Sequence, residues 1–324
     1  MMFDLPDDDV LYDALLARDA AWDGRAWVGV ASTGVFCRLT CPARKPKRDN
    51  CTFFDTIGGA LEADPSRRWA EADEAAMGLD LSTVRRAFKQ HFGMTFLEMA
   101  RLARLRAGGV ELVAGGSVIQ AQMVAGYESG SAFCAAFGAW MGLPPGAFVK
   151  KAVLRADWIE TPMGAMVAVA SHTALHLLEF PERKALPAEL AALRKDAKGA
   201  LGFGRFGPTE QIEREMADFM GGVSAEFATP LRPFGTPFTQ GVWRALREIP
   251  AGEARSYIAV ARAMGRPDAT RAVARANGAN PIAIAIPCHR VLGADGSLTG
   301  YGGGLWRKQK LIELERGFAA KKAT

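Results

Sequence analysis

The chain has 324 residues, of which 49% are hydrophobic and 23% are charged. This composition predicts a soluble globular protein of two or three domains and excludes a disordered chain. The net charge of +5 permits an acidic partner such as nucleic acid without requiring one. No apolar run reaches membrane-span length, and the start "MMFDLPDDDV" lacks a signal-peptide core. With only five cysteines, we expect a cytoplasmic protein with free thiols and no membrane partner.

The first region, residues 1–65, carries a cysteine pair with metal-ligand spacing. Cys37 and Cys41 form a C-x3-C pair in "GVFCRLTCPARKPKRDNCTFF", but structural zinc needs four ligands. No C-x-x-C pair follows in "TIGGALEADPSRRWAEADEAAMG". Two alternatives stay open: free thiols, which the missing pair favours, or a zinc site completed by Cys51 and an acidic residue. The acidic candidates are Asp55, Glu62 and Asp64.

Residues 66–150 are predicted to be almost entirely helical. In "LDLSTVRRAFKQHFG", Ser82 is expected to cap a helix whose exposed side carries Arg85, Arg86 and Lys89. A helix, a glycine turn and a basic helix follow one another as in a helix-turn-helix, whose second helix enters the major groove. A second copy, "SVIQAQMVAGYESGSAFCAAFGAWMGLPPGAF", follows a helix expected at about 95–107 and is expected to be capped by Ser117. The alternative is a helical bundle without a DNA-binding role, but two copies in this order favour DNA binding.

The second recognition helix, residues 129–140, departs from this pattern. Its solvent-facing positions hold serine and alanine, with no Arg or Lys. Because base and phosphate contacts depend on cationic side chains, we expect little sequence-specific binding from this half. Cys134, between two phenylalanines, is expected to be a small core residue.

Residues 233–319 contain several short helices and then an isolated thiol. We expect Ser256 and Asp268 to cap two of the helices, and the second helix is rich in small residues. A helix this thin could approach the floor of a DNA groove, with Arg271 projecting from it. The stretch "IAIAIPCHRVLGADG" then presents Cys288 beside His289. This thiol is a metal ligand, a core residue or a nucleophile with a neighbouring base, and local sequence leaves the three open.

Three resemblances narrow these alternatives. The motif "GVFCR-x-x-CPAR" resembles the N-terminal zinc domain of the Ada family, and residues 68–149 resemble AraC-type DNA-binding domains. Residues 235–318, with "R-A-V…N-P-x-x-I-x-I-PCHRV…GYGGG", resemble O6-alkylguanine-DNA alkyltransferases. Together they resemble the Ada family. The implied fold is a multidomain α+β protein: an Ada-type domain (1–65), an all-α double helix-turn-helix (66–150), an α/β subdomain (155–232) and a helical, winged-helix-like catalytic domain (233–319).

The resemblance implies specific catalytic roles. Cys288 matches the cysteine that accepts the alkyl group, and His289 matches the histidine that takes its proton through a water. Glu315 matches the carboxylate that orients this histidine. Asn280 matches the asparagine that links the network to the active-site loop, and Tyr257 matches the tyrosine that neutralises charge on the guanine.

It also implies DNA contacts. Arg271 matches the arginine that replaces the flipped base in the stack, and Tyr301 matches the lid over that base. Expected DNA contacts are Ala272 and Gly278 on the same helix, and Arg85, Arg86 and Lys89 in the helix-turn-helix. The expected metal ligands are Cys37 and Cys41, although their second pair is missing.

The implied activity is a single, irreversible transfer of methyl from O6 of guanine, or O4 of thymine, to Cys288 without a cofactor. The expected partners of this monomeric, nucleoid-associated protein are alkylated duplex DNA, promoter DNA and RNA polymerase. The main alternative is a transcription regulator that uses methylation of Cys288 as a damage signal. A lesion binder without chemistry is a third alternative, which the presence of Cys288 opposes.

Overall fold

The computed structural model describes residues 5–22, 26–30, 35–42, 44–54, 68–72, 82, 85–86, 88–89 and 94–322. Clustering of contacts gives two compact units, Met1–Ala107 with Val124–Gly126, and Gly108–Met123 with Tyr127–Thr324. This division does not test the four predicted domain boundaries, which stay predictions. Within the described ranges, no helix is long and apolar enough to cross a membrane.

In the described residues between 5 and 54, helix α1 packs on a small antiparallel sheet. Helix α1 (Asp8–Ala17) begins at Asp7, whose carboxylate accepts a 2.9 Å hydrogen bond from the Asp9 amide. The sheet has the order β2 (Val35–Arg38), β1 (Trp27–Val30), β3 (Cys51–Phe54), and short 3-10 turns lie at Ala20–Trp22 and Arg48–Asn50. The core contains Leu11, Leu15, Val28, Cys51 and Phe53.

Helices α5, α6 and α7 lie in the continuously described stretch between residue 94 and the larger sheet. Helix α5 (Phe96–Val113) is longer than the expected 95–107, and Thr95 with Glu98 forms a reciprocal capping box at its start. The predicted cap at Ser117 is confirmed, because its hydroxyl accepts from the Gln120 amide ahead of α6 (Val118–Val124). Helix α7 (Gly130–Met141) follows. Much of the first helix-turn-helix lies outside the described residues, and of the helix expected after Ser82 only residues 85–86 and 88–89 are described.

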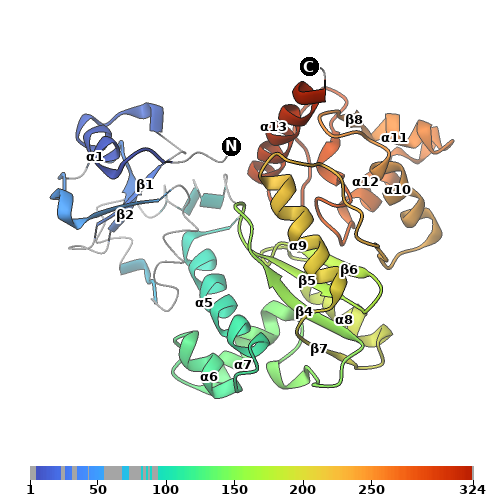
Figure 1. The fold of residues 1–324 in the computed structure, drawn as a ribbon, viewed down its shortest axis with the longest axis horizontal. Helices are drawn as coiled ribbons and strands as arrows, with labels where there is room; N and C mark the ends of the chain where they lie inside the picture. The colour runs from blue at the N-terminus through green and yellow to red at the C-terminus, as the bar shows by residue number, and fades with distance from the viewer. Residues whose placement is uncertain are drawn as a thin grey trace. The chain divides into compact units, whose positions relative to one another are not determined.

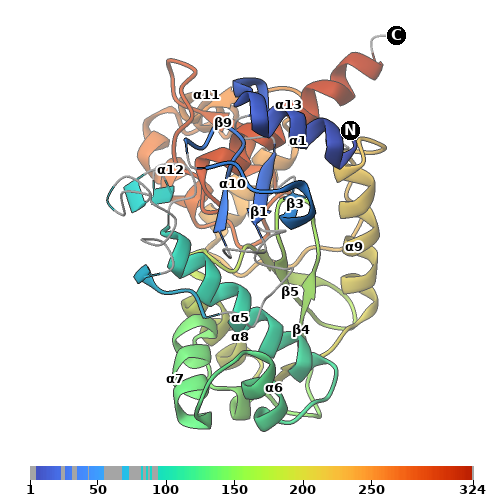
Figure 2. The ribbon, with the colours of Figure 1, turned by 90° about the vertical axis from the view of Figure 1, so that its left-hand side faces the viewer.

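The sheet expected within residues 155–232 is present. Its order is β6 (Leu175–Glu179), β5 (Met166–Ala170), β4 (Leu154–Ile159), β7 (Leu201–Phe203), with only β4 and β7 parallel. Helices α8 (Leu186–Asp196) and α9 (Gly207–Met220) complete this part. In both Figure 1 and Figure 2, α9 lies along the sheet, and its buried side chains include Ile212, Met216 and Phe219.

The remaining part is helical with a two-stranded parallel sheet. It consists of α10 (Pro237–Arg247), β8 (Arg255–Ser256), α11 (Tyr257–Ala263), α12 (Thr270–Gly278), β9 (Val291–Leu292) and α13 (Leu305–Lys322). The cap at Ser256 is confirmed, since its hydroxyl accepts from the Ala259 amide. The cap at Asp268 was wrong: a 3-10 turn, Pro267–Ala269, comes first, and Ala269 holds the N-cap position without a side-chain bond.

Candidate active site

The apolar run that leads to Cys288 is fixed on the edge of the larger sheet. The Leu178 amide of β6 donates to the Pro281 carbonyl at 2.9 Å, and the Leu178 carbonyl accepts from the Ala283 amide at 2.7 Å. Ile284 adopts a φ of 70°, which a β-branched residue rarely does, and it is held there in a fully apolar setting. The run therefore reaches the short 3-10 turn Cys288–Arg290 along a fixed path.

The Cys288 thiol is buried and has a specific polar partner. Its side chain is 5% exposed, and Sγ accepts a 3.1 Å hydrogen bond from Nδ2 of Asn280. Asn280 also donates to the Ile286 carbonyl at 2.8 Å and accepts from the Ile282 amide at 3.1 Å, so it fixes the loop as well as the sulfur. Burial raises the pKa of Cys288 to about 11, although the Asn280 bond opposes this shift. The thiol is therefore protonated at neutral pH and needs a base to become a nucleophile.

His289 and Glu315 form a buried pair beside this thiol. Nε2 of His289 lies 2.8 Å from Oε1 of Glu315, and Arg290 donates to both oxygens of the same carboxylate. Burial raises the pKa of Glu315, but the hydrogen bonds and charges of His289 and Arg290 outweigh it and bring that pKa to about 2. The carboxylate therefore stays ionised, and it favours the tautomer of His289 that carries its proton on Nε2.

The other ring nitrogen of His289 is available for proton transfer. Nδ1 is buried, and no group in the described part of the chain is hydrogen-bonded to it. Burial also lowers the pKa of His289, so the ring is neutral near pH 7. A neutral imidazole with a free Nδ1 lone pair, in the residue next to Cys288, has the features of a general base.

The predicted lid and DNA-contact residues surround this group. The Tyr301 ring lies edge-on to His289, with 6.4 Å between centroids, and its buried hydroxyl has no partner among the described residues. Tyr257 is half-buried, and a Cβ on Gly300, in the loop that carries Tyr301, would lie 3.9 Å from its hydroxyl. Arg271, Ala272 and Gly278 are exposed on α12. The structure thus joins Cys288, Asn280, His289, Glu315 and Tyr301 in one place and leaves the α12 residues on the surface.

Two buried cationic residues near this group were not anticipated from the sequence. Arg290 is buried and anchors Glu315, as described above. Lys308 is fully buried on α13, and its Nζ donates to the carbonyls of Val291 at 2.5 Å and Thr299 at 2.6 Å. Burial lowers the pKa of Lys308 to about 8. The spacing along the sequence could have indicated the burial of Lys308, because Lys308, Leu311 and Glu315 fall on one face of a helix.

The glycines after Tyr301 allow close packing of the active-site loop. A Cβ atom on Gly303 would lie 2.6 Å from Cδ2 of Phe180 and 2.9 Å from Cε1 of Tyr301. We therefore expect Gly303→Ala to displace the lid and to lower the free energy of unfolding by about 1–3 kcal/mol, as overpacking does. Denaturant unfolding and the rate of alkyl transfer would check both effects. The matched control is Gly317→Ala on α13, where a Cβ meets nothing within 4 Å and neither quantity should fall.

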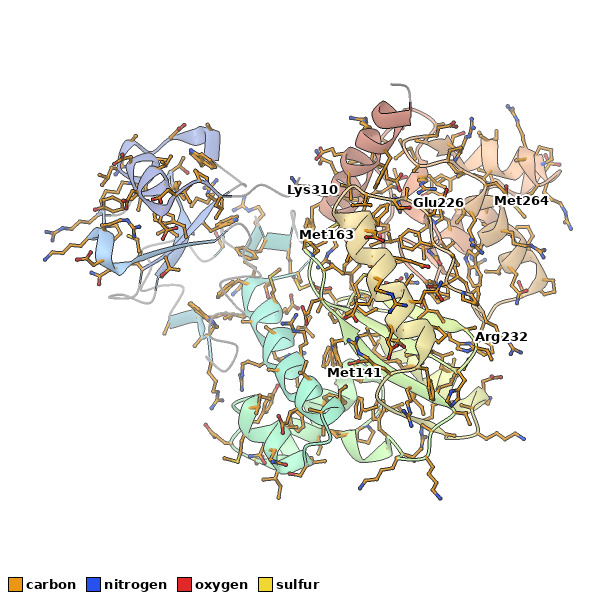
Figure 3. The ribbon with its side chains drawn as sticks, in the orientation of Figure 1. Met141, Met163, Glu226, Arg232, Met264 and Lys310 are labelled. Atoms are coloured by element: carbon orange, nitrogen blue, oxygen red, sulfur yellow. The ribbon has the colours of Figure 1, made fainter. Side chains whose placement is uncertain are left out.

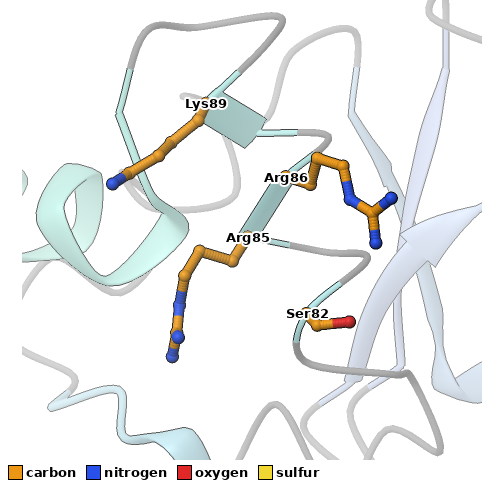
Figure 4. A pocket seen from close by; sticks show the side chains of 4 residues that line it. All are labelled: Ser82, Arg85, Arg86 and Lys89. Carbon is orange, nitrogen blue, oxygen red and sulfur yellow. The ribbon is translucent and has the colours of Figure 1, made fainter.

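The predicted basic helix presents a concentrated positive charge. Arg85, Arg86 and Lys89, with Ser82, line a hollow of about 540 Å³ in the N-terminal unit (Figure 4). Arg85 pairs with Glu71 at 2.7 Å, and all three cationic residues are exposed. The exposed positions of α7, by contrast, offer no cation; they are Ser131, Ala132, Ala135 and Ala139.

The N-terminal cysteines are the expected metal ligands. Cys51 is buried in the core, and its thiol donates to the Lys47 carbonyl at 3.3 Å. Cys41 is half-buried, while Cys37 lies on β2 opposite Val28 and its side chain is outside the described residues. Within the ranges that the structure describes, no three His, Cys, Asp or Glu residues cluster as metal ligands do. Asp55, Glu62 and Asp64 also lie outside those ranges.

Family models match each part of the chain. Residues 237–317 match "6-O-methylguanine DNA methyltransferase, DNA binding domain". Residues 10–68 match "Metal binding domain of Ada", and residues 74–151 match "Helix-turn-helix domain". The C-terminal unit therefore contains a domain of the methyltransferase class, in the same chain as a helix-turn-helix.

Individual relatives extend this result to the whole chain. The "Bifunctional transcriptional activator/DNA repair enzyme Ada" of Escherichia coli K12 is 31% identical over 345 residues, covering 95% of this chain and 96% of that protein. A "Methylated-DNA--protein-cysteine methyltransferase" of Methanosarcina barkeri is 40% identical over 49% of this chain and 95% of its own length. The crystal structure of the Mycobacterium tuberculosis O6-methylguanine methyltransferase has 39% identity and a TM-score of 0.44, covering 50% of this chain and 93% of that chain. This chain belongs to the Ada family.

Proposed function

We propose that this protein repairs DNA by transferring a methyl group from O6 of guanine to Cys288, once per molecule. The proposal rests on the buried side chains of Asn280, Cys288, His289 and Glu315, which lie together at the candidate active site. The thiol is held by Asn280, and it is followed by His289, which has a free Nδ1 and an ionised carboxylate, Glu315, on its Nε2. These are the parts that nucleophilic catalysis by a cysteine requires.

The transfer proceeds by displacement at carbon. Nδ1 of His289 takes the thiol proton, through a water as the family resemblance implies, and Sγ of Cys288 attacks the methyl carbon. The S–C bond forms as the C–O6 bond breaks, and its electron pair passes to the guanine ring system. The Tyr257 hydroxyl neutralises the charge that develops there. No cofactor enters the reaction, and the thioether product is too stable to be displaced, so the protein acts once.

The target carbon cannot be reached inside a duplex, so the nucleotide must leave the stack. Helix α12 is the element suited to groove entry, because Ala272 and Gly278 give it a thin, exposed surface. Arg271 on the same helix occupies the space that the flipped base leaves. Tyr301 then packs on the base beside His289.

A second function, regulation of transcription, is favoured by the match of residues 74–151 to a helix-turn-helix domain. The basic hollow around Arg85, Arg86 and Lys89 supplies the DNA contact, and methylation of Cys288 supplies the damage signal. The uncharged surface of α7 supports a role for the first recognition helix alone. In this function the protein acts as a monomer on nucleoid DNA and contacts RNA polymerase at promoters.

The test of repair uses duplex DNA that carries labelled O6-methylguanine. Peptide mass analysis should find one methyl group per chain on Cys288, and the label should be absent from Cys288→Ala. Cys134→Ala is the matched control and should accept the full amount, since Cys134 lies on α7. Label on another residue, or no label in the unaltered protein, would sink the proposal.

The contribution of the basic helix can be measured by its salt dependence. Each of Arg86→Ala and Lys89→Ala should weaken binding to duplex DNA of any sequence and reduce the salt slope of log K by about 1. Arg214→Ala, an exposed arginine on α9, is the control and should leave the slope unchanged. Fluorescence anisotropy over a salt series gives these slopes. An unchanged slope for both Arg86→Ala and Lys89→Ala would mean that this helix does not bind DNA.

A further inference from the structure

The turn after β6 places a buried arginine against the end of α12. The side chain of Arg183 is 7% exposed, and its Nη1 donates to Glu179 at 2.7 Å. Its Nη2 pairs with Glu189 at 3.0 Å and donates to the Gly278 carbonyl at 3.1 Å. A side chain from the sheet-bearing part of the chain therefore supports the last residue of the helix proposed to enter the DNA groove.

The same guanidinium lies under the active-site loop. A Cβ on Gly302, the residue after Tyr301, would lie only 2.8 Å from Nη1 of Arg183. The residue after Gly302 is held by a second arginine. Arg307 donates to the Gly303 carbonyl at 2.9 Å and to the Met163 carbonyl at 2.8 Å (Met163 is labelled in Figure 3). The loop that carries Tyr301 thus rests on arginines that are bonded to the sheet-bearing part.

These contacts constrain the distance between the end of α12 and the loop that carries Tyr301. Arg183 is planar, presents its donors in a fixed geometry and is held by two carboxylates. The guanidinium of Arg183 also donates to the Gly278 carbonyl and lies next to Gly302, which has no side chain. The three heavy atoms nearest to a Cβ on Gly302 would all belong to Arg183.

We propose that Arg183 is a positioning residue for alkyl transfer, and that it limits the size of the alkyl group that reaches Cys288. It does so by fixing the distance between the end of α12 and the Tyr301 loop. The proposal rests on the alkyl transfer proposed above, and it gives the sheet-bearing part a role in that reaction. An ion pair that only stabilises the fold would not affect the choice between alkyl groups.

The experiment compares single-turnover transfer to Cys288 from one duplex that carries either O6-methylguanine or O6-benzylguanine, at saturating DNA. Arg183→Met should slow methyl transfer more than benzyl transfer, so that the methyl-to-benzyl rate ratio falls about tenfold, within the range for small misplacements. Arg183→Lys keeps the charge but not the planar fork, and its ratio should be intermediate. Arg214→Met, the same substitution on exposed α9, should leave the ratio unchanged.

A second comparison tests the contact with the loop itself. Gly302→Ala alone should slow methyl transfer. Added to Arg183→Met, it should slow methyl transfer little further, because the new Cβ then has room. Equal effects of Gly302→Ala in both backgrounds, or equal slowing of methyl and benzyl transfer by Arg183→Met, would overturn the proposal. If Arg183→Met does not fold, Arg183→Lys takes its place in both comparisons. Failure of the unaltered protein to methylate Cys288 would instead overturn the proposed function.

Discussion

Replacing Glu315 by glutamine is expected to slow methyl transfer about a hundredfold and to lower the free energy of unfolding by about 3 kcal/mol. Glu315 is 1% exposed and accepts hydrogen bonds from both His289 and Arg290. The neutral amide cannot stabilise the imidazolium that forms when His289 takes the thiol proton. It also leaves the buried Arg290 guanidinium without its counter-charge, and this is the larger cost to stability.

Single-turnover transfer and denaturant unfolding measure the two effects. Glu313→Gln is the matched control, because Glu313 is an exposed residue of the same helix and bonds only to Gln309 in the contacts described. The pH dependence checks the cause. Because folding lowers the pKa of Glu315 from 4.5 to about 2, its contribution is complete above about pH 4.5 and is lost as the pH falls toward 2. The stability difference between the unaltered protein and Glu315→Gln should shrink over that window; a constant difference would refute the assigned pairing.

Replacing His289 by asparagine is expected to slow transfer at pH 7 by about 10²–10⁴-fold, the usual contribution of a general base. Without the base, the reaction depends on thiolate formed by bulk solvent. Burial raises the pKa of Cys288 to about 11, so the thiolate fraction and the rate of the variant should rise about tenfold per pH unit below that value. The unaltered protein should show no such rise above neutral pH, because burial lowers the pKa of His289 and the base is already neutral.

A pH–rate profile from neutral to moderately alkaline pH gives this comparison. His172→Asn is the control, since His172 is exposed in the turn between β5 and β6. The control should follow the unaltered protein at every pH. If the transfer rate of His289→Asn is lower than that of the unaltered protein by the same factor at every pH, His289 is not the base. Its role is then limited to holding the turn at Cys288.

Local sequence was sufficient where neighbours along the chain decide the structure. The caps at Ser117 and Ser256 depend on a hydroxyl and an amide three residues away, and both are confirmed. The cap at Asp268 was wrong because Pro267 begins a 3-10 turn, so that Ala269 becomes the N-cap of a helix that starts at Thr270. The fold class was implied by the family resemblance of the motifs, and it is confirmed by the sheets, the helices and the family matches.

The sequence by itself determined the family, the candidate acceptor and the pattern of charge on the recognition helices, because each is written in a short continuous motif. Only the tertiary structure decided which distant groups meet. It placed Arg290 on Glu315 and Arg183 under Gly302, and it packed α7 against the larger sheet through a 3.0 Å bond from Trp140 Nε1 to the Pro181 carbonyl. Such contacts join residues dozens of positions apart, and they form only when whole elements bury their apolar faces together, a condition that no local pattern encodes.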